Sequence, residues 1–426
     1  MTEIQTVASL IFTLTFLLIV TEMIHRTVAA LVGAGLMVLY GVIPYDEVLG
    51  FIDFETIGII IGMMLVVEVV STTGLFQLIA IKAAKRAKGD PAKLFIFFMG
   101  LTTAFSAFLT DAATMLIMAS ITIMIARVTK MNPVPFLIYE VIFTNVGGLT
   151  TLISSVPCIM VGAEANLSFV DFLVNLGPLV LMLFGATICM VKVILKGGFQ
   201  RISNVEKLIE MDEWGAVTNR RLFWRSLLVL AATIAAFVAG SPLGWPPVIV
   251  ALGAGIAMLL LSGVSPEKTL REIDWSTVFF FAGIFVVLGG VERVGIFEGV
   301  ASLVRLVGIN PVIAGVSILW FSSLASVGVH NIVITATLIP IIRDLVTVLG
   351  AGAEPLWWML VVGATLGGSI IPIGSVAGVI ALGVAEREGH AISMGEFTRV
   401  GALTALIQMG LATVYFVVRY LRPIAI

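Results

Sequence analysis

The sequence predicts an all-α membrane protein built from two copies of one helical unit. Two observations carry this fold class. Hydrophobic residues make up 59% of the 426 residues and charged residues only 12%, and the second half of the chain repeats sparse polar motifs of the first. A soluble domain carries about 25% charged residues, so a water-soluble core cannot hide this apolar excess. The composition therefore excludes a soluble enzyme, a nucleic-acid binder and a disordered scaffold.

About 20 apolar residues cross a bilayer as a helix, and ten runs have this character. They are 5–24, 27–43, 56–74, 135–162, 172–194, 226–240, 246–263, 277–294, 356–382 and 400–418. Two further runs, 94–128 and 310–343, are too long for one span and are polar at their centres. Because each arm is short for a full crossing, we expect re-entrant hairpins; two ordinary antiparallel helices per run are the alternative.

The distribution of Lys and Arg predicts the orientation. With the basic segment 82–93 in the cytoplasm, nineteen of the 24 Lys and Arg residues lie on the cytoplasmic side. Those on the external side are Arg293, Arg305, Arg343, Arg419 and Arg422. We expect a multi-pass protein of the cell (inner) membrane with both termini external. The first residues carry no Lys or Arg, unlike a secretory signal, so the first run is interpreted as a retained helix.

The two halves match at a nearly constant offset of 220 or 221 residues. The matches include Asp53 and Thr56 with Asp274 and Thr277, and Gly147-Gly148 with Gly367-Gly368. Each half holds five spans and one hairpin. Because five is odd, the second copy enters from the opposite side, as in many secondary transporters with inverted repeats.

This repeat predicts the domain organisation. The first repeat covers 1–195 with its hairpin at 94–128 and a broken helix at 135–162; a cytoplasmic linker covers 196–225; the second repeat covers 226–426 with its hairpin at 310–343 and a broken helix at 356–382. Discontinuous helices are expected at the midplane, where the repeats meet.

Four segments interrupt the apolar pattern at membrane depth: the two hairpin centres and two Gly-Gly breaks. Gly-Gly followed by Ser or Thr and Pro does not continue a regular helix, and the freed backbone groups need partners. Small residues also line ordinary helix contacts, but that explains four symmetry-related segments less well. The expected substrate-binding residues are Thr110, Asp111, Thr114, Asn145, Gly147, Gly148, Thr150, Thr151, Ser154, Ser155, His330, Asn331, Thr335, Gly367, Gly368, Ser369 and Ser375.

Asp111 is the strongest single candidate, because an ionisable group at the bilayer centre costs about 2.5–3.5 kcal/mol. We expect it to exchange a proton during transport; the alternative is an N-cap of the second hairpin helix. His330, Glu68 and Glu140 are the other proton-coupling candidates, with structural or interfacial roles as their alternatives. Cys158 is expected to pack rather than to bind. The chain lacks hydrolase, zinc-protease and Walker motifs, so we expect no enzyme activity, cofactor or metal site.

At these segments the sequence resembles the ion transporter superfamily, which includes the ArsB arsenite transporters, the P protein, the NhaD sodium/proton antiporters and the divalent-anion/sodium symporters. The symporters carry Ser-Asn-Thr at two hairpin tips, where this chain has 110–112 and 330–332. ArsB transporters are similar in having Asp at the first tip, here Asp111, followed by two small residues. The resemblance covers essentially the whole chain.

The resemblance implies export of arsenite, and of antimonite, from the cytoplasm in exchange for protons. Arsenite is an uncharged trihydroxide at neutral pH, which suits the Thr, Ser, Asn and backbone groups of the four breaks. A cytoplasmic ATPase partner would dock on the linker or on cytoplasmic loops. The alternatives are a sodium/proton antiporter, a symporter of a small anion or dicarboxylate and, from a different class, an intramembrane enzyme using Asp111 and His330. The inverted repeat argues against the enzyme.

Overall fold

The computed structural model describes residues 2–21, 23–194, 204–217, 219–295, 310–350 and 352–421. Throughout these ranges the regular structure is helical, with no strand. Nine helices within them are long and apolar enough to cross a membrane. The all-α membrane fold class is therefore confirmed. The count of ten spans and two re-entrant hairpins stays a prediction, because three of the four hairpin helices also have the length to cross.

The described part of the first half is a series of α-helices with one 3-10 helix. In chain order the elements are α1 (Glu3–Val20), α2 (Arg26–Leu39), η1 (Tyr45–Phe51), α3 (Phe54–Thr72), α4 (Leu75–Ala87), α5 (Pro91–Ser106), α6 (Asp111–Thr129), α7 (Val134–Gly147), α8 (Val156–Glu164) and α9 (Phe169–Ile194). The predicted broken helix at 135–162 is thus divided into α7 and α8.

The described part of the linker and of the second half is helical as well. Its elements are α10 (Val205–Glu210), η2 (Trp214–Ala216), α11 (Arg220–Leu243), α12 (Pro247–Ser262), α13 (Pro266–Arg271), α14 (Trp275–Arg293), α16 (Pro311–Gly328), α17 (Asn331–Leu349), α18 (Pro355–Gly367), η3 (Pro372–Gly374), α19 (Val376–Arg387), α20 (Met394–Phe416) and η4 (Val417–Leu421). The second predicted broken helix, 356–382, is divided between α18 and α19.

Matching residues start matching helices in the two halves. The Oδ1 atom of Asp53 accepts hydrogen bonds from the backbone N–H groups of Glu55 and Thr56 at 2.9 and 3.0 Å. The Oδ1 atom of Asp274 accepts one from the N–H of Thr277 at 3.1 Å. An N-cap carboxylate satisfies donors that have no partner inside the helix. Helices α3 and α14 therefore begin for the same physical reason.

The predicted linker at 196–225 is described only in part, since 196–203 and 218 lie outside the described residues. Within it, α11 begins at Arg220 rather than at 226. The Asn219 side chain explains this start, because its Oδ1 accepts hydrogen bonds from the N–H groups of Arg221 and Leu222 at 3.0 and 3.1 Å. The apolar pattern alone misses the first turns of α11, because basic residues interrupt it there.

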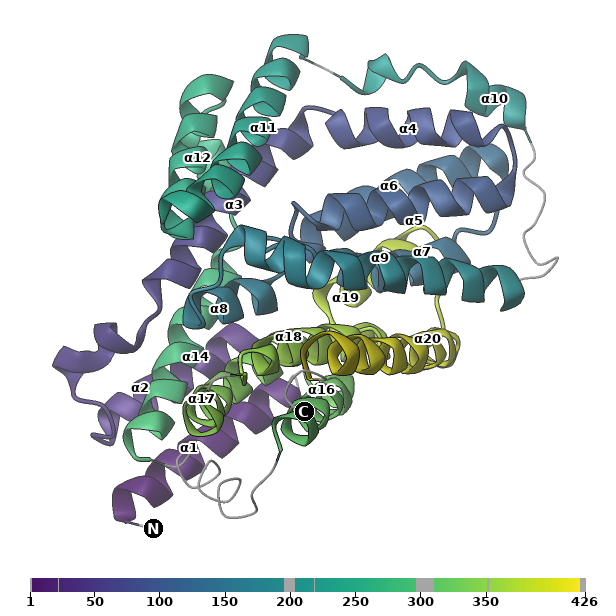
Figure 1. The fold of residues 1–426 in the computed structure, drawn as a ribbon. Helices are drawn as coiled ribbons and strands as arrows, with labels where there is room; N and C mark the ends of the chain where they lie inside the picture. Colours follow the sequence, from purple (N-terminus) through teal and green to yellow (C-terminus); the bar gives the residue numbers. More distant parts are fainter. Residues whose placement is uncertain are drawn as a thin grey trace.

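The helices form two groups, which Figure 1 shows as a column of steep helices beside a stack of helices that run across it. The lateral group comprises α1–α3, η1 and α11–α14. The hairpin group comprises α5–α9 and α16–α20. Each group mixes both halves of the chain: α2 packs on α14 and α3 on α12 in the lateral group, while α6 packs on α19 and α8 on α17 in the hairpin group.

Two glycines at matching positions allow the close crossings in the lateral group. A Cβ atom on Gly283 of α14 would lie 2.8 Å from the carbonyl carbon of Ala30 in α2. A Cβ atom on Gly62 of α3 would collide with the backbone of Ala251 in α12. Small residues permit such backbone contact between membrane helices, so these glycines fix how the two halves interlock.

Helix α4 joins the two groups. Gly74, with φ of 81°, supplies the left-handed conformation that turns the chain sharply out of α3. The described part of the linker packs on α4: Glu213 pairs with Lys85 at 3.4 Å, and the Trp214 ring lies 5.2 Å from the Lys82 Nζ atom. The linker therefore covers the connection between the groups.

Candidate functional site

Both hairpins turn at the polar residues that the sequence singled out. The Thr110 Oγ1 atom accepts a hydrogen bond from the N–H of Ala113 at 3.3 Å, which makes Thr110 the N-cap of α6. The His330 Nδ1 atom accepts one from the N–H of Ile332 at 3.4 Å and caps α17. The alternative that Asp111 is the N-cap is therefore wrong, since Asp111 is the first residue inside the helix.

A cavity of about 230 Å³ lies between the hairpin tips and the lateral group. We call it the tip cavity. Its polar lining from the hairpin group is Thr110, Asp111, Ser154, His330 and Asn331, and its polar lining from the lateral group is Arg26, Glu68, Glu272, Asp274 and Thr277. The cavity thus brings together both tips, one Gly-Gly break and one of the additional carboxylates that the sequence suggested.

Asp111 and His330 each present a polar atom without a partner. Asp111 Oδ1 and His330 Nε2 are buried and accept or donate no hydrogen bond among the described residues. An unpaired buried polar group costs about 1–3 kcal/mol, so such groups are expected where a ligand or a proton completes them. Asp111 also lies at the N-terminus of α6, where the helix dipole favours negative charge.

The first Gly-Gly break contacts the tip of the first hairpin through hydrogen bonds and close packing. The Thr151 hydroxyl donates to the carbonyl of Ala107 at 2.5 Å, just before the tip. The Ser154 hydroxyl lies 2.5 Å from the Gly148 carbonyl and 2.6 Å from that of Thr151. A Cβ atom on Gly148 would lie 3.0 Å from Asp111 Oδ1. The absence of a side chain at this position therefore leaves space for the carboxylate.

The second break is linked to the first through Asn145. Its Nδ2 atom donates to the Ser369 hydroxyl at 2.7 Å and lies 3.4 Å from that of Ser375. Gly367 packs where a Cβ atom would collide with the Ser323 carbonyl, and a Cβ atom on Gly368 would lie 2.9 Å from the carbonyl oxygen of Gly374. This arrangement joins residues of both halves inside the hairpin group.

The remaining predicted residues do not line the tip cavity. These are Thr114, Asn145, Gly147, Gly148, Thr150, Thr151, Ser155, Thr335, Gly367, Gly368, Ser369, Ser375 and Glu140. Most are buried. Thr335, for example, donates its hydroxyl to the carbonyl of Asn331, within its own helix, at 2.9 Å. Their positions support the tips rather than face the cavity.

The two additional carboxylates are in different places. Glu68 lines the tip cavity from α3. Glu140 is fully buried in α7, where one oxygen accepts a hydrogen bond from Thr122 of α6 and the other has no partner among the described residues. Glu140 is therefore enclosed by protein rather than exposed on the surface of α7. Cys158 is also buried, with its Sγ atom 3.2 Å from the Gly148 carbonyl oxygen, which is a packing position.

Sequence reasoning missed the charged wall supplied by the lateral group. The Arg26 guanidinium lies 5.6 Å from the centre of the Phe280 ring, and its Nη2 atom is 3.5 Å from Thr277 Oγ1. In the sequence, Arg26 is only a charge near the end of a run, and Asp274 is only a marker of the repeat. The repeated Asp-x-x-Thr pattern was the available signal, but it could not show that one copy faces the hairpin tips.

Comparison with known proteins fits this architecture. The citrate transporter family, CitMHS, matches residues 16–363. The chain belongs to this family. An uncharacterized transporter of Mycobacterium tuberculosis is 34% identical to this CitMHS member over 422 residues, covering 97% of this chain and 98% of the relative. The human P protein is 28% identical, covering 97% of this chain and 60% of the P protein.

A solved membrane transporter has a similar fold. The YdaH transporter of Alcanivorax borkumensis superposes with a TM-score of 0.63 at 14% sequence identity, over 96% of this chain and 97% of YdaH. The protein is therefore a multi-pass membrane transporter of the CitMHS type and not an enzyme. These relationships agree with the resemblance to the ion transporter superfamily. The arsenite branch of that superfamily stays a prediction.

Proposed function

We propose that the protein is a secondary transporter that exports a small solute from the cytoplasm through the tip cavity in exchange for protons, with arsenite, and also antimonite, as its substrate. The observation that carries this proposal is Asp111. Its buried Oδ1 atom has no hydrogen-bond partner among the described residues and lies at a cavity bounded by both helix groups. A carboxylate in that position exchanges a proton as the groups move relative to each other.

The lining of the tip cavity suits an uncharged solute with several hydroxyl groups. Thr110, Ser154 and Asn331 supply hydroxyl and amide groups. Carboxylates outnumber guanidinium groups in this lining, with Glu68, Asp111, Glu272 and Asp274 against Arg26. Such a lining repels a polyanion and accepts a neutral molecule or a proton.

Everted membrane vesicles test the proposal directly. The Asp111→Asn variant keeps the size of the side chain and its capacity to form hydrogen bonds but cannot titrate. We expect it to lose proton-driven arsenite accumulation by roughly tenfold or more, as removal of a general acid–base group does. Glu140→Gln is the matched control, because Glu140 is a buried carboxylate outside the tip cavity. Equal accumulation by Asp111→Asn and wild type at several pH values would exclude Asp111 as the coupling group.

A second candidate function is symport of a small carboxylate, and Arg26 is the observation that favours it. Its guanidinium is a fixed positive charge at the tip cavity, and a guanidinium binds a carboxylate through two parallel hydrogen bonds. The family is described as citrate transporters. Uptake of labelled citrate that falls in Arg26→Gln but not in Arg221→Gln, an exposed residue of the same group, would favour this function.

We further propose the arrangement in the membrane. The repeats are 1–195 and 226–426, the linker between them is cytoplasmic, both termini are external, and the protein resides in the cell (inner) membrane. An ATPase partner, if one is used, would dock on the described linker segment 204–217 over α4. The distribution of Lys and Arg supports this orientation.

A further inference from the structure

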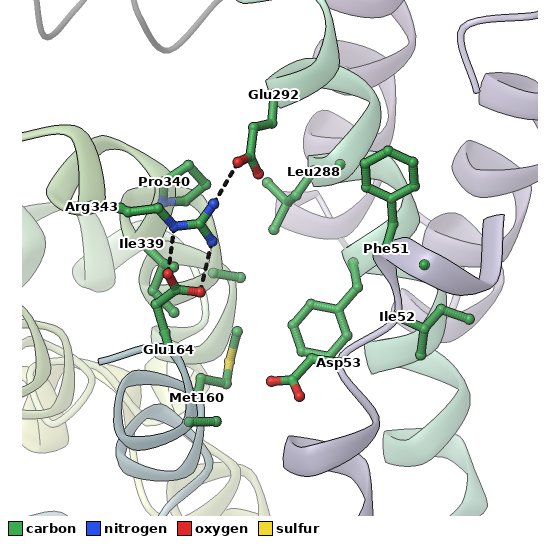
Figure 2. A pocket seen from close by; sticks show the side chains of 15 residues that line it. Phe51, Ile52, Asp53, Met160, Glu164, Leu288, Glu292, Ile339, Pro340 and Arg343 are labelled. Atoms are coloured by element: carbon green, nitrogen blue, oxygen red, sulfur yellow. Dashed lines mark hydrogen bonds and ion pairs between the residues drawn. The ribbon is translucent and has the colours of Figure 1, made fainter. Parts of the chain in front are cut away.

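A second cavity, of about 320 Å³, lies between the same two helix groups. We call it the far cavity. Figure 2 shows its charged residues on both walls: Asp53 and Glu292 from the lateral group face Glu164 and Arg343 from the hairpin group. Its helices α14, α8 and α17 are the repeat counterparts of α3, α19 and α6, which contribute to the tip cavity, and η1 is the counterpart of α13, which ends one residue before Glu272 of that cavity.

Four helices run from one cavity to the other. Each of these helices has one end at the tip cavity and the other at the far cavity. The residues at the tip cavity are Glu68 of α3, Thr277 of α14, Val156 of α8 and Asn331 of α17. Those at the far cavity are Asp53, which caps α3, Glu292 of α14, Glu164 of α8 and Arg343 of α17. Between these ends lie Met63, Ile159, Phe281 and Val333, which belong to one buried apolar cluster. Buried apolar side chains therefore lie between the two ends of each of these helices.

Arg343 joins the two groups across the far cavity. Its Nε and Nη2 atoms donate to the two carboxylate oxygens of Glu164 at 2.5 and 2.7 Å, within the hairpin group. Its Nη1 atom donates to Glu292 Oε1 at 2.5 Å, on α14 of the lateral group. By contrast, the pairs Arg127–Glu388 and Arg293–Glu47 each join residues of one group.

We propose that the far cavity is the second access vestibule of the transporter and that the Arg343–Glu292 contact closes it. The proposal rests on the transport function proposed above. A small solute that leaves the tip cavity passes the apolar residues between the two ends of these helices and exits through the far cavity. For this to happen, α17 must move relative to α14, and the Arg343–Glu292 contact must break.

The geometry makes this contact reversible. When Glu292 moves away, Arg343 keeps its two hydrogen bonds to Glu164, so the guanidinium retains a charged partner. The Arg343 and Glu292 side chains are 42% and 44% exposed, so water screens their attraction. The contact therefore biases the equilibrium between closed and open states without locking it.

Cysteine labelling tests the proposal without any substrate. Ala336 of α17 lines the far cavity but is only 1% exposed. An Ala336→Cys protein, with the exposed Cys189 replaced by Ser, would be treated with a membrane-impermeant maleimide in intact cells and in everted vesicles. We expect Glu292→Ala to raise the labelling rate about two- to fivefold from one side only, in line with the weight of a partly exposed ion pair. Arg293→Ala is the matched control, since it breaks the neighbouring pair within the lateral group.

Ionic strength provides the second measurement. Raising salt should increase labelling of the parent Ala336→Cys protein, because it screens the Arg343–Glu292 attraction, and should leave Glu292→Ala unchanged. Equal labelling in Glu292→Ala and Arg293→Ala, or a parental rate independent of salt, would overturn the proposal. Since no substrate is present, a wrong substrate assignment does not alter either outcome.

Discussion

At the scale of single residues, Gly148 and Asp111 depend on each other. A side chain at 148 would enter the space of the carboxylate, with its Cβ atom 3.0 Å from Asp111 Oδ1 and 3.4 Å from the Ser155 Cβ atom. Such contacts require neighbours to shift by a few tenths of an ångström, and the end of the Asp111 side chain can shift more easily than the surrounding backbone can. Gly148 therefore sets the position of the proposed proton site rather than the fold.

We predict that Gly148→Ala lowers proton-coupled transport by roughly tenfold while the protein still folds, because a small misplacement of a reacting group is costly. Transport in everted vesicles, normalised to monodisperse protein in detergent, measures this. Gly410→Ala in α20 is the control, since a Cβ atom there meets open space. Full activity in Gly148→Ala would show that the carboxylate tolerates displacement.

Asn145 has a structural role at the junction of the two breaks. We predict that Asn145→Ala lowers stability by about 1 kcal/mol, the usual weight of a hydrogen bond between membrane helices. Thermal unfolding in detergent measures the shift of the midpoint. Ser120→Ala is the control, because the exposed Ser120 hydroxyl bonds only to the Leu116 carbonyl of its own helix. An unchanged midpoint would mean that the 2.7 Å contact with Ser369 contributes nothing net.

The sequence showed part of the site at this scale. Asp111 and His330 were predictable because polar groups are expensive inside apolar runs. Arg26 was not, because it lies between two apolar runs, where a basic residue is ordinary, and because it reaches the cavity from the other helix group. The local hydropathy pattern shows where a polar residue is energetically unfavourable, but it does not show which distant helix packs against that residue.

At the scale of helices, Gly62 and Gly283 control the crossings α3–α12 and α2–α14. We predict that Gly283→Ala destabilises the protein by about 1–3 kcal/mol through overpacking, since the added methyl group would press on the Ala30 backbone. Gly35→Ala in α2, where a Cβ atom meets nothing within 4 Å, should be neutral or slightly stabilising. Detergent unfolding midpoints of the two variants decide the matter: if they are equal, the crossing is not tight.

The presence of the helices and the positions of their breaks were predictable from the sequence, while the start of α11 was not. The Gly-Gly breaks placed the ends of α7 and α18 correctly, because glycine pairs followed by Ser, Thr and Pro act locally. The apolar pattern places the start of α11 too late, because Asn219 caps a turn whose outer face is basic. Long basic side chains keep their charged ends in water while the helix beneath them is formed.

At the scale of the molecule, the repeat alone did not reveal the two helix groups. An offset of 220 residues indicates which helices correspond, but packing decides that α2 meets α14 and α3 meets α12. That exchange needs contacts between residues far apart in the chain, which hydropathy does not encode. The transporter class and the resemblance to the ion transporter superfamily, by contrast, follow from the sequence.

The orientation gives a prediction at the same scale. Cysteines introduced at the exposed positions Glu210, in α10, and Asp46, in η1, should react with an impermeant reagent from opposite sides of the membrane. Glu210→Cys should label only in everted vesicles and Asp46→Cys only in intact cells. Labelling of both from the same side would refute the proposed ten-span arrangement, in which α10 is cytoplasmic and η1 external.

Helix α17 connects its cap His330, at the tip cavity, to Arg343, about 20 Å further along its axis. Binding at one end of the helix and the ion pair at the other end are therefore thermodynamically coupled. Any preference of the substrate or proton for one state at His330 and Asn331 must appear, by reciprocity, as an equal change in the strength of the Arg343–Glu292 contact. Salt, which weakens that distant contact by screening, would then alter the apparent affinity for a solute that never touches it.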